Sequence, residues 1–304
     1  MEGRAAARLF LDEFGYLVVD NVLTPGEVSE AFTLFEAFMK HYDVDYRNDR
    51  FGDASVGMAG RSSIGHSSLN WFVRSREAVK NAFRFAFDVS PDTKMISSFD
   101  GINVFRNPEV DKAYQGSLEP WFHLDAGKWS DGDCIQGLVN LIDCTDDNDA
   151  GLVVFPKSNN TIFKKIVKED PTNYSRMTYI GPYESKMISK LGVTETPHRV
   201  PLRAGSLAMW RSSTIHCSTA CLPRAKPDPA QSLRRLVVYT CMCPDPRNAE
   251  LTEARLGAFH RGNTTCHEPH RVCASSGSAA THAVAAGVVI IEEARLPEGA
   301  AELL

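Results

Sequence analysis

A histidine and an aspartate stand two positions apart among aromatic residues in the stretch EPWFHLDAGKW, residues 119–129. In an extended strand, alternate side chains point to the same face, so His123 and Asp125 would share one face of a sheet. With a second histidine from another strand, they would form the two-histidine, one-carboxylate set that binds Fe(II) in non-haem oxygenases and leaves positions open for substrate and oxygen. A surface histidine beside a surface aspartate is the alternative interpretation of this motif alone.

The third ligand is expected far along the chain, on a strand that returns beside the first. His216 in AGSLAMWRSSTIHCS fits this position, because Gly205 makes a turn, SLAMW is typical of a strand, and the histidine follows a short connector. The other histidines have less suitable contexts, at a helix end, in polar or proline-flanked loops, or beyond the β-rich part of the chain: His41, His66, His198, His260, His267, His270 and His282.

Such an iron site needs an electron source, which in a large class of oxygenases is 2-oxoglutarate. This co-substrate chelates the metal through its keto-acid end, and its distal carboxylate needs a buried cation. Arginine suits the role because its planar guanidinium binds carboxylates through paired hydrogen bonds and stays charged when buried. Arg234 and Arg235 open the apolar strand after His216, and alternation lets only one of them point inward. Arg224, in a proline-rich loop, is a third candidate.

A helix is the clearest of the elements that must position these residues. Thr24 is a predicted N-cap, Pro25 stands at the first helical position, and Glu27 completes a capping box, so the sequence predicts a helix over residues 24–42. Its apolar stripe predicts that it packs on a sheet. The stripe consists of Val28, Ala31, Phe32, Phe35, Phe38 and Met39.

The rest of the chain changes from helical to β-rich patterns. The polar interval 43–70 predicts a long connection of the kind that forms lids or binding loops, and a second helix is expected over residues 75–88. FGYLVVDN, residues 14–21, is typical of a short strand, and interval 157–200 is interpreted as an insertion. From about residue 95 onward, short apolar runs predict strands of an antiparallel barrel or sandwich: KMISSFDGINVF, DCIQGLVNLIDC, AGLVVFP, GSLAMWR and RRLVVYTCM.

The order of these segments resembles the phytanoyl-CoA dioxygenase (PhyH) family of Fe(II)/2-oxoglutarate-dependent oxygenases over roughly residues 10–245. The segments are the H-x-D motif, DAGLVVFPKSN, AGSLAMWRSSTIHCS and the arginine pair with its apolar strand. The resemblance implies a mainly β protein with flanking α-helices. Its core would be a double-stranded β-helix, a jelly-roll or cupin-like barrel, with N-terminal helices packed on one sheet.

The implied domain is single and covers residues 1–275, followed by a tail of uncertain order over 276–304. Within the domain, we expect a helical part over 1–94, a barrel core over 95–245 and a C-terminal extension with cysteines and histidines over 246–275.

The resemblance also implies roles for individual residues. His123, Asp125 and His216 would bind Fe(II), and Ser218 with Arg234, or else Arg235, would hold 2-oxoglutarate. With O2 as the other co-substrate, the products would be succinate, CO2 and an oxidised substrate. Because the carboxylate position is an aspartate rather than a small residue, hydroxylation is expected rather than halogenation. The family's P-G-S-H sequence is replaced here by Pro156-Lys157-Ser158-Asn159.

Several further residues are candidates for the pocket. Gln136 and Asn140 share a strand face, and they would contact the co-substrate or substrate, or satisfy a polar interior. Asn103 is a similar candidate for the co-substrate. Trp129 would line the pocket or pack beneath the metal, and Lys128 would meet an acidic substrate or be solvated.

The C-terminal extension carries Cys241, Cys243, Cys266, His267, His270 and Cys273. Zinc binds such side chains in tetrahedral sets, but the spacing is not that of a standard zinc knuckle. We expect this segment to pack near the barrel mouth, with His267 contributing to the pocket, and a structural zinc is the alternative.

Composition limits the function classes. The 304 residues are 43% hydrophobic and 23% charged, an ordinary globular balance. A net charge of −5 lacks the basic footprint of nonspecific nucleic-acid binding. No signal peptide or membrane span is evident, so a soluble, cytoplasmic enzyme is expected. Its substrate would be a small organic molecule. A protein side chain or nucleobase as substrate and a non-catalytic metal-binding barrel remain alternatives, and the oligomeric state is open.

Overall fold

The computed structural model describes residues 2–49, 51, 57–59, 63–108, 111–112, 122–124, 134–146, 149–159, 178–180, 196–214, 216–219, 232–246, 248–263, 267–270 and 303. Asp125, Lys128, Trp129 and Arg224 lie outside these residues. No helix within the described ranges is long and apolar enough to cross a bilayer.

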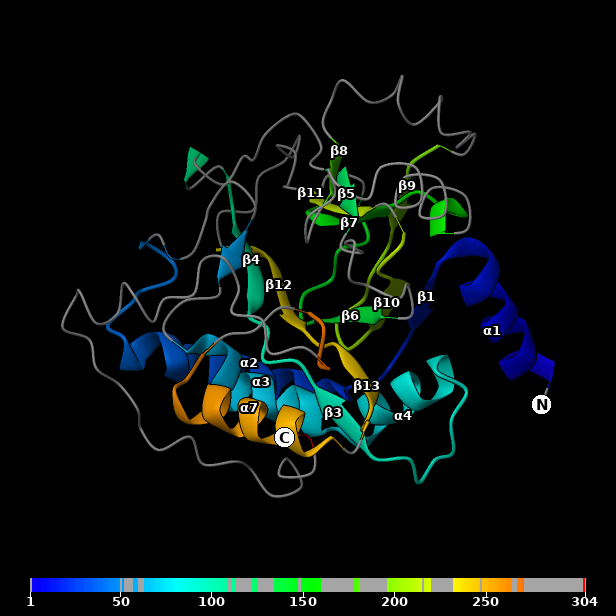
Figure 1. Cartoon of the computed structure of the whole chain (residues 1–304). Helices are drawn as coiled ribbons and strands as arrows, with labels where there is room; N and C mark the ends of the chain where they lie inside the picture. Colours follow the sequence, from blue (N-terminus) through cyan, green and yellow to red (C-terminus); the bar gives the residue numbers. More distant parts are fainter. Residues whose placement is uncertain are drawn as a thin grey trace.

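Two antiparallel sheets make up the β-rich part of the chain (Figure 1). The larger sheet has the order β1 (Tyr16–Val19), β10 (Leu207–Arg211), β6 (Ile135–Asn140), β12 (Leu233–Tyr239), β4 (Ile102–Arg106) and β2 (Met58–Ala59). The smaller sheet has the order β8 (Thr178–Ile180), β5 (Phe122–Leu124), β11 (His216–Thr219), β7 (Gly151–Val154) and β9 (His198–Val200). A separate pair joins β13 (Met242–Pro244) to β3 (Met95–Ser97).

The chain passes back and forth between the two sheets, which is the path of a double-stranded β-helix. β4, β6, β10 and β12 belong to the larger sheet, while β5, β7 and β11, which alternate with them along the chain, belong to the smaller one. Apolar side chains from the inner faces of both sheets pack into one cluster, formed by Leu138, Leu152, Val154, Val200, Leu202, Ala208, Trp210 and Val237. The predicted antiparallel β core is therefore confirmed.

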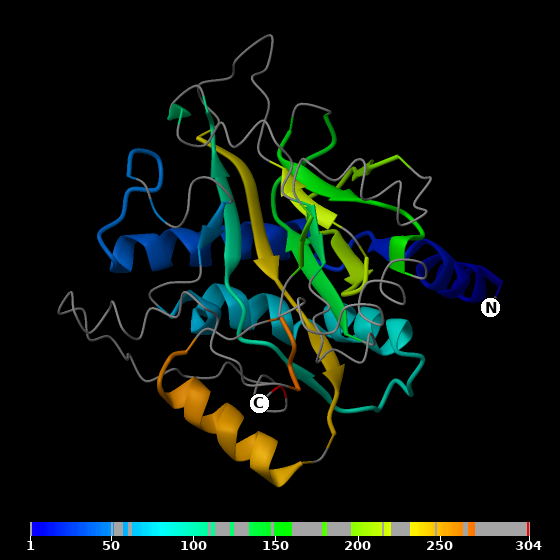
Figure 2. The ribbon, with the colours of Figure 1, turned by 45° about the horizontal axis from the view of Figure 1, so that its top comes forward.

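Helices pack on the outer face of the larger sheet (Figure 2). α2 (Pro25–His41), α3 (Ser68–Ser75) and α4 (Glu77–Ala86) form this layer, with a short 3-10 turn over Ile64–His66. α1 (Glu2–Phe14) lies at the edge of the sheet beside β1, and α7 (Ala249–His260) lies farther from the sheet, beyond the helical layer. The alternate residues of the sheet, among them Val104, Val139 and Leu236, join the apolar side chains of these helices in the main core. This arrangement confirms the prediction that N-terminal helices pack on one sheet.

The sequence prediction for α2 is confirmed in detail. The Thr24 hydroxyl accepts a hydrogen bond from the Glu27 backbone amide, and the Glu27 carboxylate accepts one from the Thr24 amide. Ala31, Phe35 and Met39 are buried, as the stripe predicts. By contrast, α1 and α7 were not expected, and α3 begins inside the interval that the sequence suggests is a long connection.

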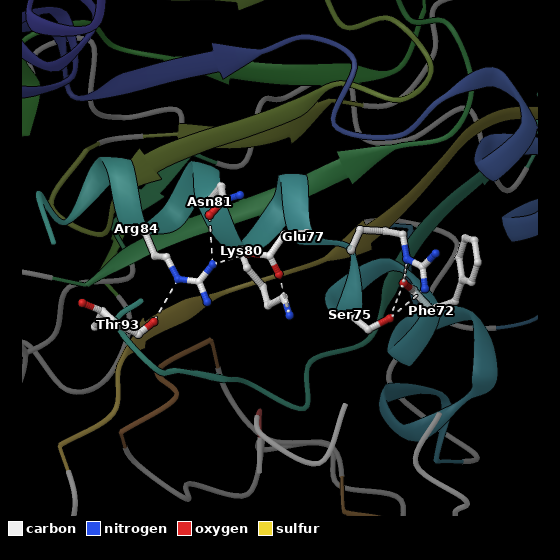
Figure 3. Close-up of polar contacts among 8 residues, drawn as sticks. Phe72, Ser75, Glu77, Lys80, Asn81, Arg84 and Thr93 are labelled. Carbon is white, nitrogen blue, oxygen red and sulfur yellow. Dashed lines mark hydrogen bonds and ion pairs between the residues drawn. The ribbon is translucent and has the colours of Figure 1, made fainter. Parts of the chain in front are cut away.

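The junction between α3 and α4 shows why the predicted second helix begins later than expected. Arg76 separates them with extended backbone angles, and its side chain donates to the Phe72 carbonyl and lies over the Phe72 ring. Within α4, Arg84 donates to Glu77, Asn81 and the Thr93 carbonyl (Figure 3). The predicted helix over 75–88 thus begins later, at Glu77, and is tied at its end to the segment that leads into the sheet.

The C-terminal helix α7 is held against the helical layer by buried polar groups. Arg255 donates to the carbonyls of Ser97, Pro269 and Leu303. The imidazole of His66 hydrogen-bonds through Nε2 to the Asn263 carbonyl, while its ring packs on aromatic side chains of three segments. These are Trp71, Phe99 and Phe259. Burial lowers the pKa of His66 to about 4.

We expect His66 to make stability depend on pH. Its pKa is about 4 in the fold and about 6.5 when unfolded, so the unfolded chain binds more protons between these values. Stability should therefore fall as pH decreases from 6.5, by at most about 1.4 kcal/mol per pH unit from this residue. Urea unfolding of wild type and His66→Gln at pH 7 and pH 5 would measure this. The variant should lose less stability, and an equal loss would contradict the assignment.

Candidate functional site

The two predicted histidine ligands lie directly opposite each other on neighbouring strands. His123 of β5 is the register partner of His216 of β11, in an antiparallel pair. Partners at opposite positions of such a pair share one face of the sheet. His123 is buried, with 6% of its surface exposed. Segments that are far apart in the sequence are thus brought together as the metal hypothesis requires, and Asp125 follows β5 but lies outside the described residues.

The shared face is the one that points between the sheets. On its other side, His216 is in register with Val154 of β7, and Ser218 is in register with Leu152. Val154 and Leu152 both belong to the cluster packed between the two sheets. Positions 216 and 218 of β11 therefore lie on the inner face of the smaller sheet.

Arg235 lies on the inner face of the larger sheet, opposite the histidine-bearing sheet. On β12 it is two residues from Val237, which belongs to the inner cluster, and on β4 its register partner is Phe105. Arg235 is 1% exposed, and none of its three guanidinium nitrogens has a hydrogen-bond partner in the part of the chain that the structure describes. Its place in the ladder, its burial and its unsatisfied nitrogens together distinguish it from Arg234.

A β-bulge explains how two adjacent arginines take different positions. The register of β12 against β4 shifts between Leu233 and Arg235, so Arg234 is the extra residue. Leu233 and Leu236 both belong to the main core, on the outer face of the larger sheet. They are three positions apart, whereas residues on one face of a regular strand are separated by an even number of positions. Arg234 is also buried, at 4% exposed, and its carbonyl accepts a hydrogen bond from the Cys144 thiol.

Cys144 is the ionisable neighbour of Arg235, but it is no counter-ion. Burial raises the pKa of this thiol to about 11, although the charge of Arg235 acts in the opposite direction. The thiol donates to the Ile142 carbonyl at 3.3 Å. At neutral pH it therefore remains protonated and supplies no negative charge to the guanidinium.

The two polar residues predicted to share a face of β6 have different environments. Asn140 is fully buried, and its amide donates to the carbonyls of Ile142, Leu202 and Arg203. It therefore joins the end of β6 to the turn before β10. Gln136 is 3% exposed, and its Nε2 has no hydrogen-bond partner among the described residues.

Asn103 is fully buried on β4, where it is in register with Val237 of β12 and therefore belongs to the inner face. Its position is compatible with the co-substrate role that the sequence suggested. The carbonyl of His267 accepts a hydrogen bond from the Cys134 thiol, one residue before β6. This contact brings the C-terminal extension to the end of the barrel at which β6 begins.

No cluster of three metal-binding side chains is found within the described ranges. Asp125, Cys266 and Cys273 lie outside them, so neither the iron triad nor the zinc alternative is tested by this observation.

The departure from the family sequence at Lys157 has a structural counterpart. Lys157 has a φ of 63°, a left-handed conformation that favours the glycine of the family pattern. Its amide donates to the Phe14 carbonyl, and its ammonium lies 2.9 Å from the Glu13 carboxylate. Asn159 donates to the Asp12 carbonyl. The altered sequence thus joins the end of β7 to α1.

We expect Asn140→Leu to destabilise the fold, because three buried carbonyls would lose their donor. A loss of about 2 kcal/mol in the free energy of unfolding is expected, as measured by urea denaturation. A change smaller than about 0.5 kcal/mol, the usual range for surface substitutions, would contradict the structural role of this amide.

Comparisons with known proteins identify the fold. No family model matches the sequence, and no curated protein matches it. Solved structures do match. The epimerase SnoN in complex with Fe3+, α-ketoglutarate and nogalamycin RO has a TM-score of 0.55 and 16% identity, over 80% of this chain and 84% of that one. AviO1 from Streptomyces viridochromogenes Tue57 has a TM-score of 0.52 and 15% identity, over 80% and 96%.

A third similar structure covers nearly the whole chain. GIG2 (DUF1479) from Candida albicans has a TM-score of 0.56 and 14% identity, over 97% of this chain and 79% of that one. At these identities the similarity establishes the fold, which agrees with the strand order and with the resemblance noted in the sequence. The chain has the double-stranded β-helix fold of the non-haem, α-ketoglutarate-dependent enzymes.

Proposed function

We propose that this protein is an Fe(II)/2-oxoglutarate-dependent dioxygenase that hydroxylates a small organic substrate. The observation that carries the proposal is the guanidinium of Arg235. It is buried between the sheets and has no hydrogen-bond partner among the described residues. A buried charge is costly unless it is paired. A dicarboxylate co-substrate would provide the missing partner.

The residues around Arg235 fit 2-oxoglutarate. A guanidinium binds a carboxylate through two parallel hydrogen bonds, and it does so most strongly away from water. Ser218 lies on the inner face of the opposite sheet, two residues after His216. Arg235 is therefore our first choice as the anchor, whereas the sequence alone favoured Arg234. Ser218 and Asn103 would hold the rest of the co-substrate.

The metal hypothesis also fits the donor set. His123 and His216 would supply two neutral imidazoles from opposite positions of one strand pair, and Asp125 would supply the carboxylate. When bound there, Fe(II) with 2-oxoglutarate would supply the activation of O2 that gives succinate, CO2 and a hydroxylated substrate. The intact carboxylate at position 125 supports hydroxylation rather than halogenation.

The chain's own contribution would be placement and exclusion of water. Arg235 would fix the distal carboxylate and so set the direction of the co-substrate within the barrel. The apolar cluster that includes Leu138, Val154 and Val237 would keep water from the reacting groups. A small-molecule substrate agrees with SnoN, solved with nogalamycin RO, and with EctD from S. alaskensis, solved with 2-oxoglutarate and 5-hydroxyectoine.

Two adjacent arginine variants provide a matched test. Arg235→Met should weaken 2-oxoglutarate binding at least about 30-fold, because a buried charge pair is lost. Arg234→Met should change it less than about fivefold. The measurement is an anaerobic titration of Fe(II)-loaded protein with 2-oxoglutarate, followed through the weak visible charge-transfer band. His216→Ala should abolish the band.

The same variants separate anchoring from folding. Arg235→Met removes an unpaired buried charge, so the unliganded protein should be at least as stable as wild type. If Arg234→Met rather than Arg235→Met weakened binding, the anchor would be Arg234. A folded, iron-loaded wild type without the band would refute the use of 2-oxoglutarate.

A further inference from the structure

The inner face of the larger sheet carries polar residues at two heights along its strands, here called levels: one at Arg235 and one at Gln136. Val237 is opposite Asn140 and Tyr239 is opposite Leu138, so Arg235 lies beyond the end of β6, past Asn140. Gln136 lies at the start of β6, in register with Trp210 of β10. Six residues separate the two levels along the strands, or about 20 Å at the usual rise per residue. Arg235 and Gln136 therefore mark opposite ends of one face.

Ser212 continues the ladder next to Gln136. Its amide donates to the Cys134 carbonyl at 2.9 Å, so Ser212 and Cys134 form the next pair after Arg211 and Ile135. By the alternation of strands, position 212 shares the inner face with Trp210, and position 134 shares it with Gln136. Gln136 and Ser212 are then diagonal neighbours, about 7–8 Å apart at the backbone.

Both side chains are buried and have unsatisfied polar atoms. Gln136 is 3% exposed and Ser212 is 0% exposed. Neither the Gln136 Nε2 nor the Ser212 Oγ has a hydrogen-bond partner in the described part of the molecule. Buried polar groups without partners are rare in native proteins, and each costs free energy in the unliganded state. Two of them at adjacent inward positions point to an absent ligand.

2-Oxoglutarate held by Arg235 would have both of its ends occupied. Its distal carboxylate would bind the guanidinium, and its keto-acid end would bind the metal beside His216, so the pair formed by Gln136 and Ser212 is left for a different ligand. The separation of about 20 Å is between backbones, and the long Arg235 side chain spans part of it. Ser212 also lies in the connector that leads directly from β10 to His216 on β11. The diagonal pair is therefore at the end of the barrel where β11 begins with His216, the proposed metal ligand, and away from the backbone of Arg235.

The C-terminal extension reaches the same end. The Cys134 thiol donates to the His267 carbonyl, and Arg255 of α7 donates to the carbonyl of Pro269 nearby in the chain. Figure 2 shows the short segment after α7, in orange, turning back from the helix toward the sheet. Residues of the extension thus lie beside the level of Gln136 and Ser212, where they are positioned to limit the size of a substrate.

We propose that Gln136 and Ser212 form a polar subsite for the primary substrate, and that they bind a neutral carbonyl oxygen. This inference rests on the proposed function for the identity of the ligand as substrate. The amide Nε2 is a donor and the hydroxyl can donate, so the pair suits an acceptor oxygen. Neither residue is charged, which favours a ketone, ester or amide over a carboxylate. The subsite would orient the substrate while the metal centre oxidises a neighbouring carbon.

The test uses the full chain with saturating 2-oxoglutarate and two matched probes, acetophenone and ethylbenzene, which differ in the carbonyl oxygen. Ligand-observed NMR titrations give the two dissociation constants. Acetophenone should bind wild type about five- to tenfold more tightly than ethylbenzene, as expected for hydrogen bonds to neutral donors. Gln136→Leu and Ser212→Ala should each reduce this preference. Equal binding of the two probes to wild type, or an unchanged preference in both variants, would overturn the proposal.

Thermal unfolding supplies a second readout that a purely structural role would not give. Gln136→Leu should leave the unfolding midpoint unchanged or raise it, because it removes an unsatisfied buried amide. Asn140→Leu, on the same strand and face, is the matched control and should lower the midpoint. A similar decrease in Gln136→Leu would mean that the amide is already bonded, and would overturn the proposal. If wild type failed to bind 2-oxoglutarate yet preferred acetophenone, the subsite would stand and the proposed function would fail.

Discussion

A buried guanidinium without a hydrogen-bond partner among the described residues is an electrostatic constraint on the barrel interior. Several arginines of this protein are deeply buried, but most of them bond to backbone carbonyls. Arg74 donates to Gly65 and Asp100, and Arg255 donates to Ser97, Pro269 and Leu303. These bonds replace water and hold helices, loops and sheet together. Arg235 has no such bond in the described structure. Its nitrogens have no partner among the described residues, which supports the binding role proposed for this arginine.

Strand register determines which side chains reach that interior. A shift by one residue would move every side chain of a strand to the opposite face. The pairing of His123 with His216 and of His216 with Val154 assigns positions 123 and 216 to the inner face of the smaller sheet. On the larger sheet, the bulge before Arg235 restores the alternation that its apolar neighbours require. The geometry of the site thus depends on backbone pairing across several strands, while no single segment contains the site.

The sequence predicted those features that depend on local patterns. The capping box of α2, the apolar strands and the H-x-D motif are all short-range signals, and the fold follows from their order along the chain. The choice between Arg234 and Arg235 could not be made in this way, because a bulge depends on the partner strand. The docking of α7 was equally inaccessible, since its contacts come from His66 and other residues distant in the sequence. The different environments of Gln136 and Asn140 also depend on residues outside β6. The Asn140 amide finds its partners in the turn after β6 and in the segment before β10, which the pattern of β6 alone does not reveal.

The two levels of polar residues on one sheet face suggest how a common fold accommodates different substrates. Under the proposed function, the end of β6 near Arg235 would bind the co-substrate, so its requirements would be fixed by 2-oxoglutarate. The start of β6 would have no such requirement, and there Gln136 and Ser212 lie near the C-terminal extension and the connector that leads to His216. Changes at that end would alter the proposed substrate subsite with little effect on the proposed anchor, because about 20 Å of strand separates their backbones. The strand ladder that aligns the two ends depends on backbone pairing, and so it can be kept while the side chains at either end change.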